Sequence, residues 1–269
     1  MKNNQKVILI TGASSGIGKV TAQYLAEKGF KVYGTSRKPK QNHFNFELIA
    51  LDLNNEDSIQ KAFKTILEKE GRIDVLVNNA GMGITGPIEE TPTEEMRKVF
   101  ETNFFGALTM IKAVLPQMRK QNSGLIINIT SIAGYMGLPF RGIYCATKGA
   151  LETVTETIRM EVKQFGIRVS NVAPGDFATN IAAGRYHTPV FEDSAYKEIY
   201  QKNLDLMDAH VDSGSDPKEM AEQIYKIIQN PQPRIHYKVG DFMQKFSIVL
   251  KRILPDKVYE KLIMNHYGM

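Results

Sequence analysis

Short apolar runs alternate with longer amphipathic stretches along most of the chain. The runs are almost continuous in Val, Ile and Leu, which indicates strands buried on both faces, as in a parallel sheet. The predicted strands are residues 6–10, 31–35, 48–51, 73–77, 125–129, 168–172 and 235–239. The predicted helices between and after them are residues 17–28, 57–70, 94–118, 144–165 and 217–229.

The order of these elements predicts the fold class. Strands that alternate with helices form right-handed βαβ crossovers, which build a doubly wound parallel sheet with helices on both faces, the Rossmann-type α/β fold. A length of 269 residues suits one large domain with a well-buried core, and the sequence has no internal repeat, low-complexity tract or linker. We therefore expect a single domain over residues 1–269.

Residues 179–216 form a long connection with no strong periodicity. Connections of this length are usually functional or mobile. Two interpretations stand side by side: a helical lid over a substrate, or a surface helix pair held by a few anchoring side chains. The candidate anchors are Tyr186, Phe191, Tyr196, Tyr200 and Met207.

The last segment, residues 241–269, predicts a helical extension. Apolar residues at 242, 246, 249, 250 and 253 have helical periodicity opposite a Lys/Arg face, and Pro255 separates them from a second piece at residues 257–266. One interpretation is an interfacial helix that contacts a membrane surface. The favoured interpretation is a tail that packs on the domain or on a second subunit, because amphipathic helices mostly face a core.

Charge sharpens the picture of this tail. The chain carries 34 Lys and Arg against 29 Asp and Glu, a formal net charge of +5, and the surplus lies after residue 225. Nucleic acid is a poor partner, because the sequence has no nucleic-acid motif and no interleaving of aromatic and basic residues. A small-molecule substrate remains the expected partner.

The expected location is the cytoplasm. If the tail is an interfacial helix, the protein would also contact a membrane peripherally. The apolar stretch at residues 7–10 is too short for a signal peptide, and no apolar run is long enough to span a bilayer. The single cysteine, Cys145, excludes an internal disulfide and fits a reducing compartment. It reads as a small packed residue, since no histidine lies near it in sequence.

A glycine-rich turn follows the first predicted strand and opens the first predicted helix. Glycine lets the backbone approach a pyrophosphate closely, and the helix N-terminus offers unpaired N–H groups and a positive dipole end. Neighbouring serines add hydroxyl donors. The turn therefore predicts a dinucleotide-binding site made by Gly12, Ser14, Ser15, Gly16, Ile17 and Gly18.

The end of the second strand indicates which dinucleotide is bound. NAD-binding proteins of this fold carry an acidic residue there for the ribose hydroxyls. This chain has Ser36 and Arg37 instead, and an arginine suits a 2′-phosphate. We expect NADP(H) rather than NAD(H); the alternative is an ordinary solvated basic loop.

Further motifs fall at the predicted strand ends in a consistent order. They are the turn at residues 11–18, Asp52, the Asn-Asn-Ala-Gly run at residues 78–81, Asn103, Ser131, Tyr144-x3-Lys148 and Pro174-Gly175-x3-Thr179. With these motifs the sequence resembles the short-chain dehydrogenase/reductase family over residues 6–179. The tail is more weakly similar to steroid- and retinol-dehydrogenase-like members.

The resemblance implies a role for each residue of a catalytic set. Tyr144 matches the general acid/base, and Lys148, one helical turn later, is expected to lower the pKa of that tyrosine and to bind the nicotinamide ribose. Ser131 would hydrogen-bond the substrate oxygen as charge develops there. Asn103 would hold a water in a proton relay to Lys148.

The resemblance also implies a cofactor-binding set. Asp52, with Leu53 beside it, would contact adenine, and Asn79, Ala80 and Gly81 would line the adenosine side. The carboxamide would be held by Pro174, Gly175, Phe177 and Thr179. Two positions depart from common family patterns: Ser15 replaces a basic residue of many NADP-using members, and Phe177 replaces a smaller β-branched residue, so the pocket there should be narrower or more apolar.

These expectations define an NADP(H)-dependent oxidoreductase that moves a hydride between the nicotinamide and a carbonyl or secondary alcohol. The tail makes a bulky lipophilic substrate the leading class, including long-chain keto-lipids such as 3-ketosphinganine, and steroids. Small or acyl-thioester ketones are the alternative. A non-catalytic NADP(H)-binding redox sensor is a third hypothesis, which the intact catalytic set argues against.

Two further expectations concern subunit assembly and metal binding. The resemblance implies a homodimer or homotetramer that pairs through the helices at 94–118 and 144–165. The five histidines are scattered without metal-ligand spacing, so no metal site is predicted.

Overall fold

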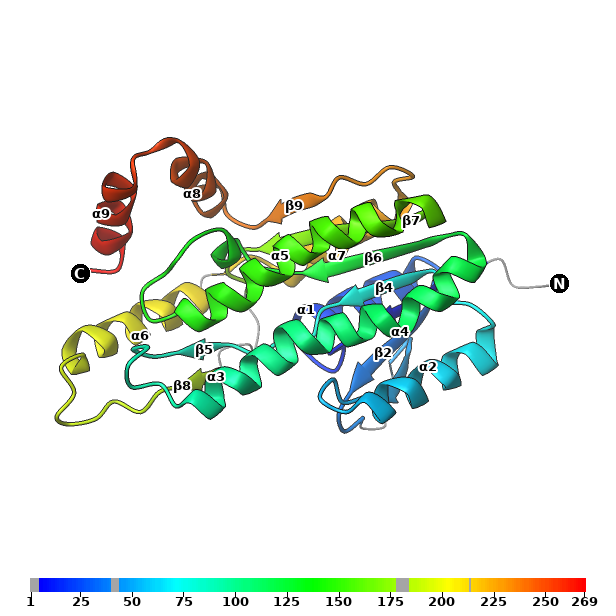
Figure 1. The fold of residues 1–269 in the computed structure, drawn as a ribbon, viewed down its shortest axis with the longest axis horizontal. Helices are drawn as coiled ribbons and strands as arrows, with labels where there is room; N and C mark the ends of the chain where they lie inside the picture. The colour runs from blue at the N-terminus through cyan, green and yellow to red at the C-terminus, as the bar shows by residue number, and fades with distance from the viewer. Residues whose placement is uncertain (1–4, 40–43, 178–183, 213) are drawn as a thin grey trace.

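A seven-stranded sheet forms the centre of the protein (Figure 1), with strand order β3-β2-β1-β4-β6-β7-β9 and every neighbouring pair parallel. The computed structural model describes residues 5–39, 44–177, 184–212 and 214–269. The predicted doubly wound parallel sheet is confirmed, and each predicted strand lies within two residues of an observed one. The strands are β1 (Val7–Ile10), β2 (Lys31–Ser36), β3 (Glu47–Ala50), β4 (Val75–Asn78), β6 (Gly124–Ile129), β7 (Ile167–Pro174) and β9 (His236–Val239).

Helices cover both faces of this sheet because successive strand residues point to opposite sides. On β1, Ile8 and Ile10 pack with α1 and α7, whereas Val7 and Leu9 pack with α2 and α4. All four side chains are essentially inaccessible to solvent. The helices of these layers are α1 (Gly16–Glu27), α2 (Glu56–Glu70), α4 (Gly106–Gln121), α5 (Gly142–Val162) and α7 (Pro217–Gln229).

The long helix predicted at residues 94–118 is interrupted. α3 (Thr93–Phe100) passes into a π-helical turn, Glu101–Phe105, before α4 begins. A π turn inserts one extra residue into the helical hydrogen-bond ladder and is often found at functional sites. Here it carries Asn103, whose side chain is 1% exposed.

The connection between β7 and α7 is held by its own side chains. β8 (Tyr186–His187) pairs with β5 (Ile84–Thr85), and α6 (Lys197–Asp212) follows. The Tyr200 hydroxyl donates to the Thr85 carbonyl oxygen at 3.0 Å, and Tyr200 and Met207 are buried. These two side chains anchor the connection, as one of the two interpretations expected; Phe191 is exposed.

The C-terminal extension forms two helices, α8 (Phe242–Ile253) and α9 (Asp256–His266), which stand together at one end of the molecule (Figure 1). Ile248 and Tyr259 are buried in a cluster with Ile132 and Met136, so the tail packs on the domain.

The opposite side of α8 carries an exposed stripe of Phe242, Phe246, Val249 and Ile253, called the apolar stripe below. The periodicity predicted this helix correctly, but of the five apolar positions it marked, Leu250 packs against the buried cluster and the apolar stripe does not. No described helix is both long and apolar enough to cross a bilayer.

Candidate active site

Close backbone packing shapes the glycine-rich turn between β1 and α1. Gly12 has a φ of +66°, and an added Cβ there would lie 2.9 Å from the Ala80 Cα. A Cβ on Gly18 would collide with the Gly12 carbonyl oxygen and the Asn79 side chain. At the N-terminus of α1, Ser15 makes no side-chain capping bond and the first turn contains no acidic residue. The first N–H groups and the positive end of the helix are therefore available to an anion.

Asn79 holds this turn in place. Its side-chain nitrogen donates to the carbonyl oxygens of Thr11 at 2.8 Å and Gly12 at 3.2 Å. In return, the Thr11 hydroxyl oxygen accepts from the backbone N–H groups of Asn79 and Ala80, each at 2.9 Å. Residues 78–81, at the end of the neighbouring strand β4, therefore hold the glycine turn in place.

A cavity of about 450 Å³, called the glycine-turn cavity below, opens over this turn. Its size is in the range of ligand sites. Arg37 stands exposed at its margin, and no carboxylate belongs to the end of β2. The residues of the expected cofactor set that line it are Gly12, Ser14, Ser15, Gly16, Ile17, Gly18, Arg37, Asp52, Leu53, Asn79, Ala80, Gly81, Tyr144, Lys148 and Pro174.

A second cavity of about 860 Å³, called the large cavity below, lies on the other side of Tyr144. Tyr144, Ile17 and Pro174 line both cavities, so the two meet at the tyrosine. Gly175 and Phe177 line the large cavity rather than the smaller one, and Phe177 adds an apolar wall there. Thr179 lies outside the described residues.

The large cavity takes much of its wall from the C-terminal helices. The 179–216 connection contributes Arg185, Gly214 and Ser215 from its described residues, whereas its anchoring Tyr200 and Met207 pack elsewhere. The aromatic residues of that connection are therefore not what makes the cavity apolar. The apolar lining comes from Ile84, Ile132, Met136, Leu138, Phe177, Met243, Leu250, Leu262 and Ile263.

Ser131, Tyr144 and Lys148 come together at the junction of the cavities. Ser131 follows β6 and hydrogen-bonds with Tyr144 near the start of α5. Lys148 is 5% exposed, and its Nζ lies 5.9 Å from the Tyr144 ring centroid. The Lys148 ammonium donates to the Ile129 carbonyl oxygen at 2.9 Å.

The pKa of Tyr144 is shifted in the direction opposite to that expected from the sequence. Burial raises the pKa of its hydroxyl, and this outweighs the hydrogen bond with Ser131 and the positive charges of Arg141 and Arg185. Burial also lowers the pKa of Lys148 to about 8, although the Glu152 carboxylate opposes that shift. The expectation of a depressed tyrosine pKa does not hold for the protein alone, because burial of the hydroxyl outweighs the neighbouring positive charges.

Asn103 lies behind the site rather than in either cavity. Its Oδ1 accepts from the Met82 N–H at 2.8 Å, and its Nδ2 donates to the Met82 carbonyl oxygen at 2.9 Å. Gly81 separates it from Lys148: a Cβ on Gly81 would lie 3.2 Å from the Asn103 Oδ1 and 3.4 Å from the Lys148 Nζ. The π turn thus brings Asn103 close to the lysine.

Several polar residues around the site escaped sequence analysis. Glu152 is buried one helical turn beyond Lys148, and the Arg141 Nε is buried without a hydrogen-bond partner at the large cavity. Glu152 could have been found, because an acidic residue at i+4 from a catalytic lysine shares its helix face.

Cys145 is buried, and burial raises the pKa of its thiol, as expected of a packed cysteine.

This fold and site geometry are those of a dinucleotide-dependent oxidoreductase, and comparison with known proteins identifies the family. A family model described as short chain dehydrogenase matches residues 6–189. The chain belongs to the short-chain dehydrogenase/reductase family, as its motifs predicted. Members of this family bind nicotinamide cofactors, and both NADP-type and NAD cofactors occur among the solved neighbours.

Similar proteins cover nearly the whole chain. It is 41% identical to a 3-ketodihydrosphingosine reductase of Bacteroides thetaiotaomicron, over 98% of each chain. It is 32% identical to mouse 17-beta-hydroxysteroid dehydrogenase type 1, over 86% of this chain and 72% of that protein. A solved short-chain dehydrogenase from Streptomyces avermitilis superposes with a TM-score of 0.82 at 31% identity, covering 99% of this chain and 97% of that one.

Proposed function

We propose that this chain is an NADP(H)-dependent reductase of bulky lipophilic ketones, which also oxidises the corresponding secondary alcohols. The observation that carries the proposal is the meeting of two cavities at Tyr144. One has the phosphate-binding turn of a dinucleotide site, and the other is large and mostly apolar. A substrate carbonyl at the Tyr144 end of the large cavity would therefore face the nicotinamide end of a dinucleotide in the smaller one.

Each side chain at the junction has a distinct task in this proposal. NADPH, when bound, supplies the hydride. Ser131 donates a hydrogen bond to the substrate oxygen, and Tyr144, kept protonated by burial, delivers the proton to that oxygen. Lys148 restores the proton of Tyr144 and holds the nicotinamide ribose. Asn103 fixes the backbone of Met82, close to Lys148.

Two features support NADP(H) over NAD(H). Arg37 stands at the margin of the glycine-turn cavity, where a guanidinium can bind a 2′-phosphate with two parallel hydrogen bonds. The end of β2 offers no carboxylate to repel that phosphate or to bind the ribose hydroxyls. Asp52, at the end of the next strand, is left for the adenine.

The substrate class follows from the large cavity and is supported by the relatives. A cavity of about 860 Å³ is at the upper end of ligand sites and suits a lipid-sized molecule. The relative at 41% identity is a 3-ketodihydrosphingosine reductase, whose substrate is a long-chain keto-lipid. The buried Arg141 Nε favours a substrate with an oxygen acceptor near the reacting carbonyl, since a donor left unpaired there is costly.

We further propose that residues 1–269 act as one catalytic unit, because α8 and α9 complete the large cavity.

Exposed Phe105 and Met160, on the π turn and on α5, support pairing of two copies through this helical face. The apolar stripe and the basic surplus near it support peripheral contact with an anionic membrane. Vesicle flotation and the mass of the protein in solution test these two contacts separately.

The test of the function is turnover on a graded panel of ketones. NADPH oxidation would be followed with a long-chain 3-keto sphingoid base, a steroid ketone, a β-ketoacyl thioester and small ketones, with NADH in parallel. We expect kcat/KM to rise with apolar size and NADPH to outperform NADH. Fastest turnover of the thioester or the small ketones would favour the alternative substrate class. Tight NADPH binding without turnover of any ketone would favour the sensor.

A further inference from the structure

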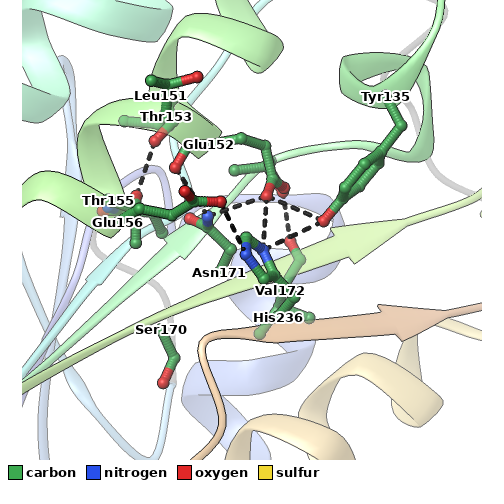
Figure 2. Close-up of polar contacts among 12 residues, drawn as sticks. Tyr135, Leu151, Glu152, Thr153, Thr155, Glu156, Ser170, Asn171, Val172 and His236 are labelled. Atoms are coloured by element: carbon green, nitrogen blue, oxygen red, sulfur yellow. Dashed lines mark hydrogen bonds and ion pairs between the residues drawn. The ribbon is translucent and has the colours of Figure 1, made fainter. Parts of the chain in front are cut away.

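A buried carboxylate lies behind the active site and is not used in the reaction described above. Glu152, on α5, is 6% exposed and accepts hydrogen bonds from four side chains (Figure 2). The Thr130 hydroxyl donates to one carboxylate oxygen, and Tyr135 at 2.8 Å, Asn171 at 2.9 Å and His236 at 2.9 Å contact the other. Each oxygen of this buried carboxylate therefore has a hydrogen-bond partner, as buried acceptors require.

Two of these donors bracket Ser131. Thr130 immediately precedes Ser131, and Tyr135 ends the 3₁₀ turn Ile132–Tyr135 that follows it. Both donate to the same residue of α5, the helix that carries Tyr144 and Lys148. Glu152 thus ties both ends of the segment that presents Ser131 to the helix that presents the other two side chains.

We propose that Glu152 is a positioning residue that holds Ser131 in register with Tyr144 and Lys148, and that His236 makes this hold dependent on protonation. The proposal rests on the catalytic roles proposed above for Ser131, Tyr144 and Lys148.

His236 carries the protonation argument through its two ring nitrogens. Nδ1 lies 2.9 Å from the Glu152 carboxylate and Nε2 lies 3.0 Å from the Glu156 carboxylate. Ionised carboxylates only accept hydrogen bonds, and a neutral imidazole has a single N–H, so both contacts need a proton on each nitrogen. The His236 side chain is 31% exposed and can exchange protons with solvent.

The other charged groups around His236 leave this pairing intact. Tyr135 stays a donor, because burial and the Glu152 charge raise the pKa of its hydroxyl. Lys238 lies over the Tyr135 ring at 5.3 Å, and the Glu152 charge partly offsets the lowering of its pKa by burial and Arg252. When the imidazole loses its second proton, all the remaining donors to Glu152 are neutral. His236 then loses its hydrogen bond either to Glu152 or to Glu156.

The charge of Glu152 also acts on Lys148. Burial lowers the pKa of the lysine to about 8, and Glu152 opposes this shift. Removing the carboxylate charge therefore lowers the pKa of Lys148 further. Because the protonated lysine restores the proton of Tyr144, the alkaline limb of kcat/KM for ketone reduction moves to lower pH.

The experiment compares Glu152→Gln with Glu161→Gln, an exposed carboxylate on the same helix. We expect Glu152→Gln to lose kcat by roughly 10- to 100-fold, as small misplacements of reacting groups do, with little change in the KM for NADPH. Its alkaline limb moves to lower pH. Tyr135→Phe removes one tether and keeps the charge, so it lowers kcat without moving that limb. Glu161→Gln behaves as the parent protein.

A second measurement needs no turnover and separates this proposal from the proposed function. Amide hydrogen exchange at Ala133 and Gly134, which bond to Ser131, reports how firmly the segment is held. We expect faster exchange in Glu152→Gln and Tyr135→Phe than in Glu161→Gln. We also expect the exchange protection of a His236→Gln protein to lack the pH dependence of the parent protein.

The outcomes are distinct. Unchanged exchange, or parent-like kcat and pH profile in a folded Glu152→Gln protein, overturns the positioning role. If Glu152→Gln does not fold, Tyr135→Phe and His236→Gln decide in the same way. If the expected differences in exchange are found in a protein that turns over no ketone, they contradict the proposed function and support the positioning role of Glu152.

Discussion

The two sides of the candidate active site are built by different means. On the glycine-turn side, Gly12 packs against the backbone of Ala80 and Gly18 against that of Gly12, and Asn79 and Thr11 complete the contact with four hydrogen bonds. On the tail side, α8 and α9 cover the large cavity through a few buried side chains, and the apolar stripe stays exposed. Backbone-to-backbone packing tolerates no replacement, whereas a wall of side chains can be exchanged. In the proposed function, the first side would hold the cofactor and the second the substrate.

The largest effect is expected at the residue where the two sides meet. Tyr144→Phe removes the proton donor and leaves both cavities in shape, so ketone reduction should fall by about 10²–10⁴-fold, the usual contribution of a general acid. NADPH affinity, measured by fluorescence titration, should stay near that of the parent protein. Turnover unaffected by the substitution would show that another group supplies the proton.

Gly18→Ala tests the claim that the glycine-turn side tolerates no replacement. The new Cβ collides with the Gly12 carbonyl oxygen, a backbone atom that cannot move aside, and overpacking of this kind costs about 1–3 kcal/mol. We expect a lower melting temperature and weak NADPH binding. Gly137→Ala is the matched control, because no atom lies within 4 Å of the position of its Cβ. Equal behaviour of the two variants would contradict the close-packing account.

Arg37→Ala sharpens the comparison within the cofactor side. A charge-assisted hydrogen bond contributes about 1.5–3 kcal/mol, so the ratio of kcat/KM with NADPH to that with NADH should fall by roughly 10- to 100-fold. The kcat at saturating cofactor should change little, because Arg37 lies at the cavity margin and not near Tyr144. An unchanged ratio would show that groups other than Arg37 determine the preference for NADPH over NADH.

The smallest effect on the enzyme itself is expected on the tail side. Replacing Phe242 and Ile253 of the apolar stripe by Ser removes well-exposed side chains, which should change the free energy of unfolding by less than about 0.5 kcal/mol each. Flotation with anionic vesicles should be lost, while turnover of a small ketone persists. Binding that survives these substitutions would place the membrane contact elsewhere.

Regular features with local causes could be predicted from the sequence. The parallel strands followed from their apolar runs, the glycine turn from its spacing, and the positions of Ser131, Tyr144 and Lys148 from their order along the chain. Features that depend on tertiary packing could not. The π turn at Asn103 leaves no trace in periodicity, and the amphipathic pattern of α8 did not show that Ile248, rather than the apolar stripe, faces the domain.

The pKa of Tyr144 was missed for a related reason. Desolvation depends on how all neighbours exclude water, which no spacing within one helix records. The position of Glu152, one helical turn after Lys148, could be read from the sequence, but its hydrogen-bond shell could not. All four donors, Thr130, Tyr135, Asn171 and His236, come from outside α5.

The position of His236 links the active site to the order in which the chain can fold. His236 begins β9, the last strand of the sheet, and pairs in register with Asn171 on β7. Both side chains bind Glu152, so its shell of donors closes only after the final strand has joined the edge of the sheet. Parallel strands pair across long stretches of chain, and such contacts form slowly. If Glu152 holds Ser131, Tyr144 and Lys148 in register as proposed, competence for turnover is reached only after this last strand is in place.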